Sequence, residues 1–142
     1  MEINITHLFV YGSLRRRFCL PEHEYISRYF TFISEARAKG LLYDTGDYPA
    51  AVKNPKETFI TGELYKAKNV GDFRLAIDQL DVYEEADTEE GIVPLYKREL
   101  TEVIYNNTIA IAWIYWYNRS IEGQTLIPSG DIMDVIEFKS KS

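Results

Sequence analysis

The hydrophobic pattern of this chain is dominated by short strands. The apolar run from Ile3 to Val10 predicts a buried strand that ends in a tight turn at Gly12-Ser13. Alternating patterns predict extended segments over residues 32–42 and 59–67, and further strand-like runs predict extended segments over residues 50–52, 95–105 and 108–117. The Asn106-Asn107 pair predicts a hairpin turn between the last two segments, and Gly62 predicts a bulge or bend within residues 59–67.

Helical spacing appears in two places, and it predicts helices over Pro21–Phe30 and Asp72–Tyr83. The apolar residues that share one face of the second helix are Phe73, Ala76, Ile77 and Leu80. An acidic loop from Glu84 to Gly91 follows this helix. With at least five strands and two helices, the pattern indicates a strand-rich α+β fold in one domain that spans residues 1–142.

The overall charge narrows the range of partners. The chain has 22 acidic and 16 basic side chains, a net charge of −6, so we do not expect a nucleic-acid partner. The basic cluster Arg15–Arg17 is either a solvated loop or a patch that steers anions. Cys19 is the only cysteine, which excludes an intrachain disulfide and fits a reducing compartment. Because no long apolar span or signal-peptide pattern is present, we expect a cytoplasmic protein with no membrane partner.

The turn at Gly12 is the first candidate for chemistry. A glycine lets the backbone approach a bound group closely, and the amides that follow it can bind a carboxylate or a developing oxyanion. The alternative is that Gly12 only permits a bend between a strand and a loop. Cys19 beside the arginines could be an activated thiol, or simply a buried cysteine.

Glu84 is the second candidate, because it comes directly after the second predicted helix. The negative end of the helix dipole disfavours an ionised carboxylate there, which suits a group that accepts and returns a proton. Alternatively, Glu84 is one of several solvated acids in its loop. The two histidines, His7 and His23, fit no zinc spacing and no Ser-His-Asp arrangement, and the chain has no phosphate-binding glycine loop.

A set of short motifs occurs in a fixed order along nearly the whole chain, from about Leu8 to about Asp131. These motifs are Tyr11-Gly12-Ser13-Leu14, Gly40-Leu41-Leu42-Tyr43-Asp44, Gly46-Asp47-Tyr48-Pro49-Ala50, Thr61-Gly62-Glu63-Leu64-Tyr65, Leu80-Asp81-Val82-Tyr83-Glu84 and Tyr96-Lys97-Arg98. Together they resemble the γ-glutamylcyclotransferase-like family, with its γ-glutamylamine cyclotransferase and AIG2-like branches. The resemblance implies a small mixed β-barrel that is flanked by short helices and has a cavity at one end.

The same resemblance implies an activity. Enzymes of this family cyclise a γ-glutamyl group and release 5-oxoproline with an amine or amino acid, without a metal or other cofactor. It implies that Glu84 is the catalytic acid and base. The residues that it implies for substrate binding are Tyr11, Gly12, Ser13, Leu14, Tyr48, Tyr96 and Arg98. Tyr115, on the last aromatic strand, is a further candidate for the pocket. We therefore expect a small γ-glutamyl substrate as the partner, and a monomer or weak homodimer.

One residue departs from the family pattern. The family commonly has glycine directly after the catalytic glutamate, where this chain has Glu85. The added negative charge predicts a preference for a cationic leaving group, such as that of a γ-glutamyl-lysine-type amine. Two other functions stay open: a binding module for a small carboxylate that performs no turnover, and an interaction domain that uses a tyrosine-rich surface.

Overall fold

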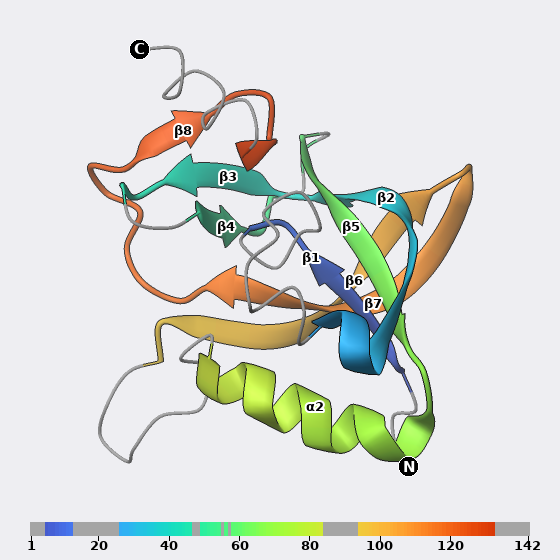
Figure 1. Cartoon of the computed structure of the whole chain (residues 1–142). Helices are drawn as coiled ribbons and strands as arrows, with labels where there is room; N and C mark the ends of the chain where they lie inside the picture. Colours follow the sequence, from blue (N-terminus) through green and yellow to red (C-terminus); the bar gives the residue numbers. More distant parts are fainter. Residues whose placement is uncertain are drawn as a thin grey trace, which may run out of the picture.

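The fold combines a closed β-barrel, a small second sheet and a helix, shown in Figure 1. The computed structural model of the protein describes residues 5–12, 26–46, 49–54, 56, 58–83 and 94–132. Its elements are β1 (His7–Val10), β2 (Phe30–Lys39), β3 (Leu41–Asp44), β4 (Pro49–Val52), β5 (Phe59–Ala67), α2 (Val70–Tyr83), β6 (Tyr96–Tyr105), β7 (Thr108–Tyr117) and β8 (Thr125–Ile127). No helix within these ranges has the length and apolar character needed to cross a bilayer.

The barrel has five strands in the order β1-β5-β2-β6-β7. Neighbouring strands are antiparallel, except that β1 and β7 close the barrel in parallel, with Leu8 opposite Trp113. The second sheet has the order β4-β3-β8 and is antiparallel. The predicted α+β fold with a small mixed barrel is confirmed.

Some element boundaries differ from the sequence predictions. The segment predicted over residues 32–42 is divided at Gly40, so that β2 and β3 belong to different sheets. Residues 26–29 are helical, but Phe30 begins β2 because it pairs with Ala67 of β5. This long-range pairing overrides the local helical pattern. The strand β8 was not predicted.

Helix α2 begins at Val70 because Asn69 caps it. The Asp72 backbone N–H donates to Asn69 Oδ1 over 2.7 Å, and Asn69 Nδ2 donates to Asp72 Oδ2 over 2.6 Å. The first bond satisfies a backbone donor that a helix start leaves without a partner, and the second holds the two side chains together. Asp72 also places an acid near the positive end of the dipole. The helix therefore starts two residues earlier than its apolar pattern predicted.

The long hairpin of β6 and β7 forms as predicted. Asn106 and Asn107 have φ values of 46° and 60°, the left-handed conformation that a two-residue hairpin turn requires. The two strands pair along their whole length, from Tyr96 opposite Tyr117 to Tyr105 opposite Thr108.

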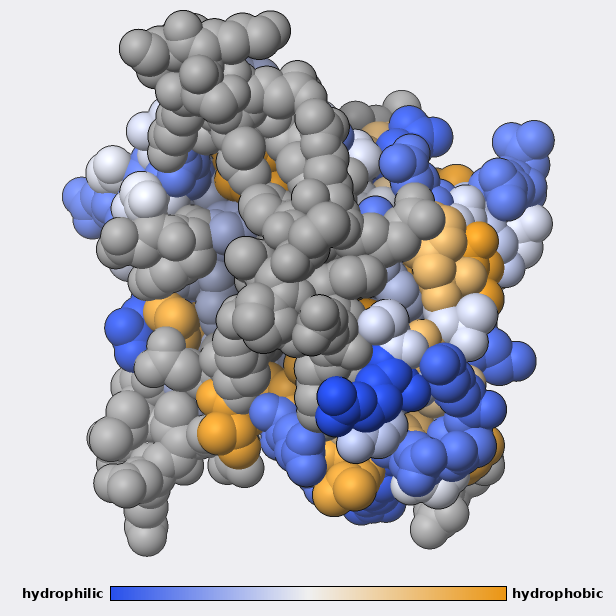
Figure 2. Space-filling model, viewed as in Figure 1, coloured by the Kyte–Doolittle hydropathy of each residue, from blue (hydrophilic) through white to orange (hydrophobic). Residues whose placement is uncertain are grey.

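Alternation along the barrel strands creates two apolar regions. The barrel interior contains, among others, Phe9, Leu64, Ala112, Ile114 and Trp116. The opposite face of the same strands is covered by α2 and residues 26–29, and we call this region the helix layer. The helix layer includes Leu8, Val10, Tyr65, Leu80 and Tyr115. In Figure 1, α2 lies alongside one side of the barrel, and Figure 2 shows hydrophilic and hydrophobic residues mixed on this part of the surface. The exposed hydrophobic residues of α2 are Val70, Leu75 and Val82.

At two positions, Gly62 and Gly130, a neighbouring backbone lies so close that only glycine fits. A Cβ on Gly62 would lie 2.3 Å from the Val10 carbonyl oxygen, so a side chain would force β1 and β5 apart. Gly62 nevertheless pairs regularly with Ala36, and the register irregularity between β2 and β5 lies between Phe32 and Ser34. Of the two alternatives predicted for Gly62, the bulge was therefore wrong, and the bend stays a prediction. Gly130, at φ 73°, accepts a hydrogen bond from Thr61 N over 2.8 Å.

Candidate active site

The end of β1 is fixed to the barrel wall by Tyr11. This side chain is buried, and its hydroxyl donates to the Tyr115 carbonyl oxygen over 2.5 Å, which joins β1 to β7. Gly12 follows, and a Cβ at that position would lie 2.9 Å from Pro49 Cγ. The bend that leaves β1 is therefore packed against the start of β4, and glycine is the residue that leaves room for this approach.

The last turn of α2 is joined to the barrel by a charged contact. Arg98 Nε lies 2.7 Å from Asp81 Oδ1, and Arg98 Nη2 lies 3.0 Å from Asp81 Oδ2, so the pair is bidentate. The Tyr115 hydroxyl donates to the same Asp81 Oδ1 over 2.8 Å. The guanidinium carbon of Arg98 lies 4.5 Å from the ring centroid of Trp113. Two side chains, Arg98 of β6 and Tyr115 of β7, thus hold one carboxylate of α2, and Trp113 supports Arg98.

The electrostatics of this contact favour the charged form of Arg98. Burial by itself lowers the pKa of Arg98, but the hydrogen bonds and charge of Asp81 outweigh it, with help from Tyr115 and Asp78, and the net change raises that pKa. An aspartate in the last turn of a helix faces the negative end of the dipole, and α2 has no basic residue in that turn. The compensating positive charge therefore comes from β6.

Tyr96 joins the same region to β4. Its hydroxyl donates to the Pro49 carbonyl oxygen over 2.7 Å, and its ring meets Tyr117 edge to face with centroids 6.0 Å apart. Pro49 therefore contacts both Gly12 and Tyr96. These contacts fix the position of Pro49. Pro49 directly follows Tyr48, a predicted substrate-binding residue, in the chain.

The structure brings five of the predicted site residues into one connected region: Tyr11, Gly12, Tyr96, Arg98 and Tyr115. The contacts run from Tyr11 through Tyr115 to Asp81 and Arg98, and from Gly12 through Pro49 to Tyr96. The other predicted residues lie outside the described residues; they are Ser13, Leu14, Arg15–Arg17, Cys19, Tyr48 and the loop Glu84–Gly91. Their predicted roles stay predictions.

Two carboxylates in this region were not singled out from the sequence. Asp81 was part of a quoted motif, and the signal that could have identified it is an acid in a last helical turn that lacks basic residues. Glu63 on β5 is 3% exposed, and its Oε1 accepts a hydrogen bond from the Tyr65 hydroxyl over 2.9 Å. Glu63 is two residues before Tyr65 on the same strand, so both side chains lie on the same face of the sheet. This spacing was the signal that could have identified a buried, hydrogen-bonded carboxylate.

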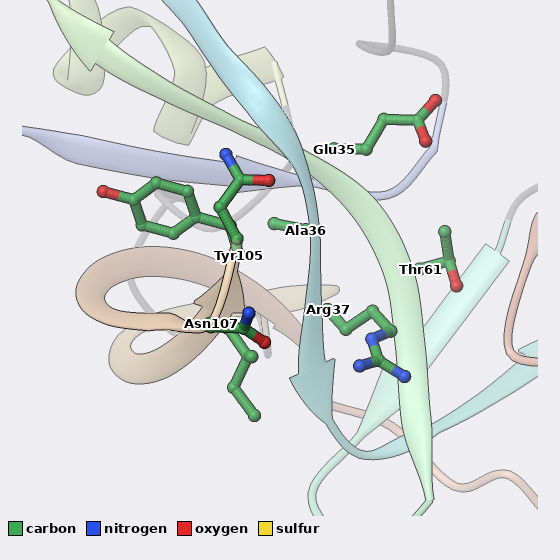
Figure 3. Close-up of a pocket in the computed structure, with 8 residues that line it drawn as sticks. Glu35, Ala36, Arg37, Thr61, Tyr105 and Asn107 are labelled. Carbon is green, nitrogen blue, oxygen red and sulfur yellow. The ribbon is translucent and has the colours of Figure 1, made fainter.

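A pocket of about 310 Å³ lies elsewhere on the barrel, shown in Figure 3. Its lining residues are Glu35, Ala36, Arg37, Thr61, Ile104, Tyr105, Asn106 and Asn107. Ile104 and Arg98 are six residues apart on β6, which corresponds to roughly 20 Å along a strand. The Glu35, Arg37 and Thr61 side chains do not converge with Tyr105 on one point in Figure 3. This pocket is therefore distinct from the region of predicted site residues.

Comparisons with known proteins agree with the fold and with the family resemblance. A family model described as gamma-glutamyl cyclotransferase, AIG2-like, matches residues 8–134. YtfP of Escherichia coli (strain K12), a gamma-glutamylcyclotransferase family protein, is 31% identical over 127 residues, which are 89% of this chain and 96% of that protein.

Two solved structures are also similar. The crystal structure of YkqA from Bacillus subtilis matches with a TM-score of 0.70 and 30% identity over 96% of this chain, which spans only 43% of that longer chain. An AIG2-like protein from Mus musculus matches with a TM-score of 0.66 and 20% identity over 91% of this chain and 90% of that chain, a likeness of fold. The chain belongs to the gamma-glutamyl cyclotransferase, AIG2-like family.

Proposed function

We propose that this protein is a cyclotransferase that releases 5-oxoproline from a γ-glutamyl amine or a γ-glutamyl amino acid. The observation that carries the proposal is that Tyr115 contacts both Tyr11, at the end of β1, and Asp81, in the last turn of α2. The predicted amide-rich bend follows Tyr11, and the predicted acid and base, Glu84, follows α2. Family membership supports the same reaction class.

The reaction needs no nucleophile from the protein. The α-amine nitrogen of the substrate attacks its own γ-carbonyl carbon, a C–N bond forms in a five-membered ring, and the bond to the leaving amine breaks. Because the amine is already tethered to the carbonyl, the protein mainly has to hold the folded conformer of the substrate. Glu84 takes the proton that the α-amine loses and returns it to the leaving nitrogen, so that protons balance over the cycle.

The bend after β1 supplies the second component of the mechanism. Negative charge develops on the γ-carbonyl oxygen during attack, and each backbone amide that donates to it typically contributes about 3 kcal/mol. The close packing of Gly12 on Pro49 supports a bend whose backbone, rather than a side chain, faces the substrate. We assign Ser13 and Leu14 to the same bend, and Tyr48 to contact with the substrate.

The test is a 5-oxoproline release assay on a panel of γ-glutamyl compounds, with wild type, Glu84→Gln and the control Glu102→Gln, an exposed acid on β6. We expect Glu84→Gln to fold normally and to lose roughly 10³-fold in kcat, the usual scale of general acid-base catalysis. Glu102→Gln should retain the wild-type rate. A panel that includes γ-glutamyl-lysine-type and γ-glutamyl-alanine-type compounds also tests the predicted preference for a cationic leaving group.

Two outcomes would change the conclusion. Near-normal turnover by Glu84→Gln would end the assignment of Glu84 as acid and base. Binding of γ-glutamyl compounds by the wild type without any release of 5-oxoproline would overturn the enzyme proposal in favour of a binding module.

A further inference from the structure

We propose that Asp81, Arg98 and Tyr115 are positioning residues for the cyclisation, and we call these three side chains the helix clamp. The inference rests on the proposed function, and it deepens that function by naming what holds the last turn of α2 at a fixed distance from the end of β1. The helix clamp acts on the reaction through Glu84, which follows Tyr83 at the end of α2 in the chain.

The bidentate pair restricts orientation as well as distance. Both oxygens of Asp81 are engaged by the planar fork of Arg98, at 2.7 and 3.0 Å. Such a fork fixes the plane of the carboxylate, whereas a lysine ammonium in its place would act as a point charge and leave the plane free. The side chains of Arg98 and Asp81 are 23% and 15% exposed, so solvent screens the contact only in part.

Arg98 is itself held in place by contacts within the barrel. Its guanidinium lies on the ring of Trp113, and its strand pairs with β7 along the whole of β6. Trp113 Nε1 in turn donates to the Ile5 carbonyl oxygen over 2.9 Å. The charged partner of α2 is therefore anchored to the barrel through contacts that do not involve the helix.

Tyr115 connects the helix clamp to the bend that is predicted to bind the substrate. Its hydroxyl donates to Asp81 on α2, while its carbonyl oxygen accepts from the hydroxyl of Tyr11. One residue thus sets the position of the end of α2 and the position of the strand end that precedes Gly12. A misplacement of about 1 Å between reacting groups can cost roughly 100-fold in rate, so this double contact matters for catalysis.

This role differs from substrate binding in what it predicts. The charge of Arg98 is already balanced by Asp81, with two of its nitrogens engaged there. Loss of the helix clamp should therefore lower kcat and leave KM nearly unchanged, whereas loss of a substrate-binding arginine should raise KM.

The experiment compares Arg98→Lys and Tyr115→Phe with two control variants, Lys97→Met and Tyr105→Phe. Lys97 is the exposed neighbour of Arg98 on β6, and Tyr105 lies at the far end of the same strand. Kinetics of 5-oxoproline release and backbone amide hydrogen exchange are measured for each variant. We expect Arg98→Lys to lower kcat by roughly 10- to 100-fold with KM within about twofold, because geometry rather than charge is lost.

Hydrogen exchange gives a readout that does not depend on activity. In Arg98→Lys and Tyr115→Phe, amides of residues 79–83 should exchange roughly tenfold faster, while amides near the capped start of α2 stay unchanged. Both controls should match the wild type in rate and in exchange. In addition, Arg98→Lys placed in the Glu84→Gln variant should cause no further loss of rate, because residues that act as a unit are not additive.

The failures of the two proposals are distinguishable. If the wild type releases no 5-oxoproline, the proposed function fails, and with it the catalytic role of the helix clamp. If the wild type is active but Arg98→Lys and Tyr115→Phe keep the wild-type kcat, the helix clamp is overturned and the proposed function stands. A raised KM with unchanged exchange at residues 79–83 would equally overturn it, in favour of direct substrate binding by Arg98.

Discussion

The barrel interior and the helix layer are built by the same strands, yet they differ in chemistry. Interior side chains such as Phe9 and Ile114 are fully buried and apolar, and Trp116 Nε1 finds no hydrogen-bond partner among the described residues. The helix layer is as deeply buried, but it contains the Glu63 carboxylate and the hydroxyl of Tyr65. The barrel interior therefore contributes apolar burial, and the helix layer adds hydrogen bonds, which are directional.

Because successive side chains of a strand point to opposite faces, one strand can contribute apolar burial on one face and positioning contacts on the other. On β7, Ile114 and Trp116 enter the interior, while Tyr115 between them contacts α2. Buried polar groups that find their partners define one arrangement of the surrounding elements, whereas an apolar interior tolerates small shifts better. We therefore expect interior substitutions to change the free energy of unfolding most, and helix-layer substitutions to affect the site more than the fold.

The largest effect on stability should come from Ile114→Ala in the interior. Removing a fully buried branched side chain leaves a cavity, and we expect the free energy of unfolding to fall by about 3 kcal/mol in urea denaturation. The matched control is Ile111→Ala on the same strand, whose side chain is 38% exposed, and it should cost less than about 1 kcal/mol. Equal costs at the two positions would contradict the division between interior and exterior.

A smaller effect is expected in the helix layer from Tyr65→Phe. The variant keeps the ring, including its edge-to-face contact with Phe32, but removes the hydroxyl that donates to Glu63. Loss of one hydrogen bond to a buried carboxylate should lower the free energy of unfolding by roughly 1 to 3 kcal/mol. Phe32→Leu, which removes the ring contact and keeps the hydrogen bond, separates the two contributions. A Tyr65→Phe variant as stable as the wild type would show that this bond is not needed.

The smallest effect concerns His7, at the start of β1. Burial, and to a lesser extent the charge of Lys66, lower the pKa of His7 below its ordinary value of 6.5. The unfolded chain therefore binds a proton more readily, so this residue should reduce stability as the pH falls through 6.5 toward the folded-state value. His7→Gln should make the free energy of unfolding less dependent on pH between about pH 8 and pH 5.5, when wild type and variant are compared by urea denaturation. An identical pH dependence in the two proteins would rule out this contribution.

Much of the fold could be predicted because local patterns and tertiary demands agree. Alternating and apolar runs identified the long strands, and the Asn106-Asn107 pair identified the hairpin. The strand β8 could not be predicted, since three residues are too few to display a period and its pairing partner, β3, lies far away in the sequence. The switch from helix to strand at Phe30 depends on Ala67, which no local pattern contains.

The candidate site was predicted through ordered motifs rather than through contacts. The motifs contain both Arg98 and Asp81, but only Arg98 was predicted to have a role, and Tyr115 was taken from the last aromatic strand, outside the motifs. Asp81 and Arg98 are 17 residues apart, and only the packing of α2 on the barrel brings them together. The place of Glu84 after the helix made it a candidate, and the family resemblance gave it the role of acid and base. That role stays a prediction that the release assay can decide.

The parallel pairing of β1 with β7 has a consequence for biosynthesis. Leu8 lies opposite Trp113, so a ribosome must add more than a hundred residues before the earliest described strand meets this neighbour. Until β7 is made, β1 can pair only with β5, and the other edge of β1 keeps unpaired backbone N–H and C=O groups. Such an edge can pair with other chains and so favours aggregation during synthesis. The Tyr11–Tyr115 contact spans 104 positions, so the geometry attributed to the active centre is among the last to be completed during synthesis.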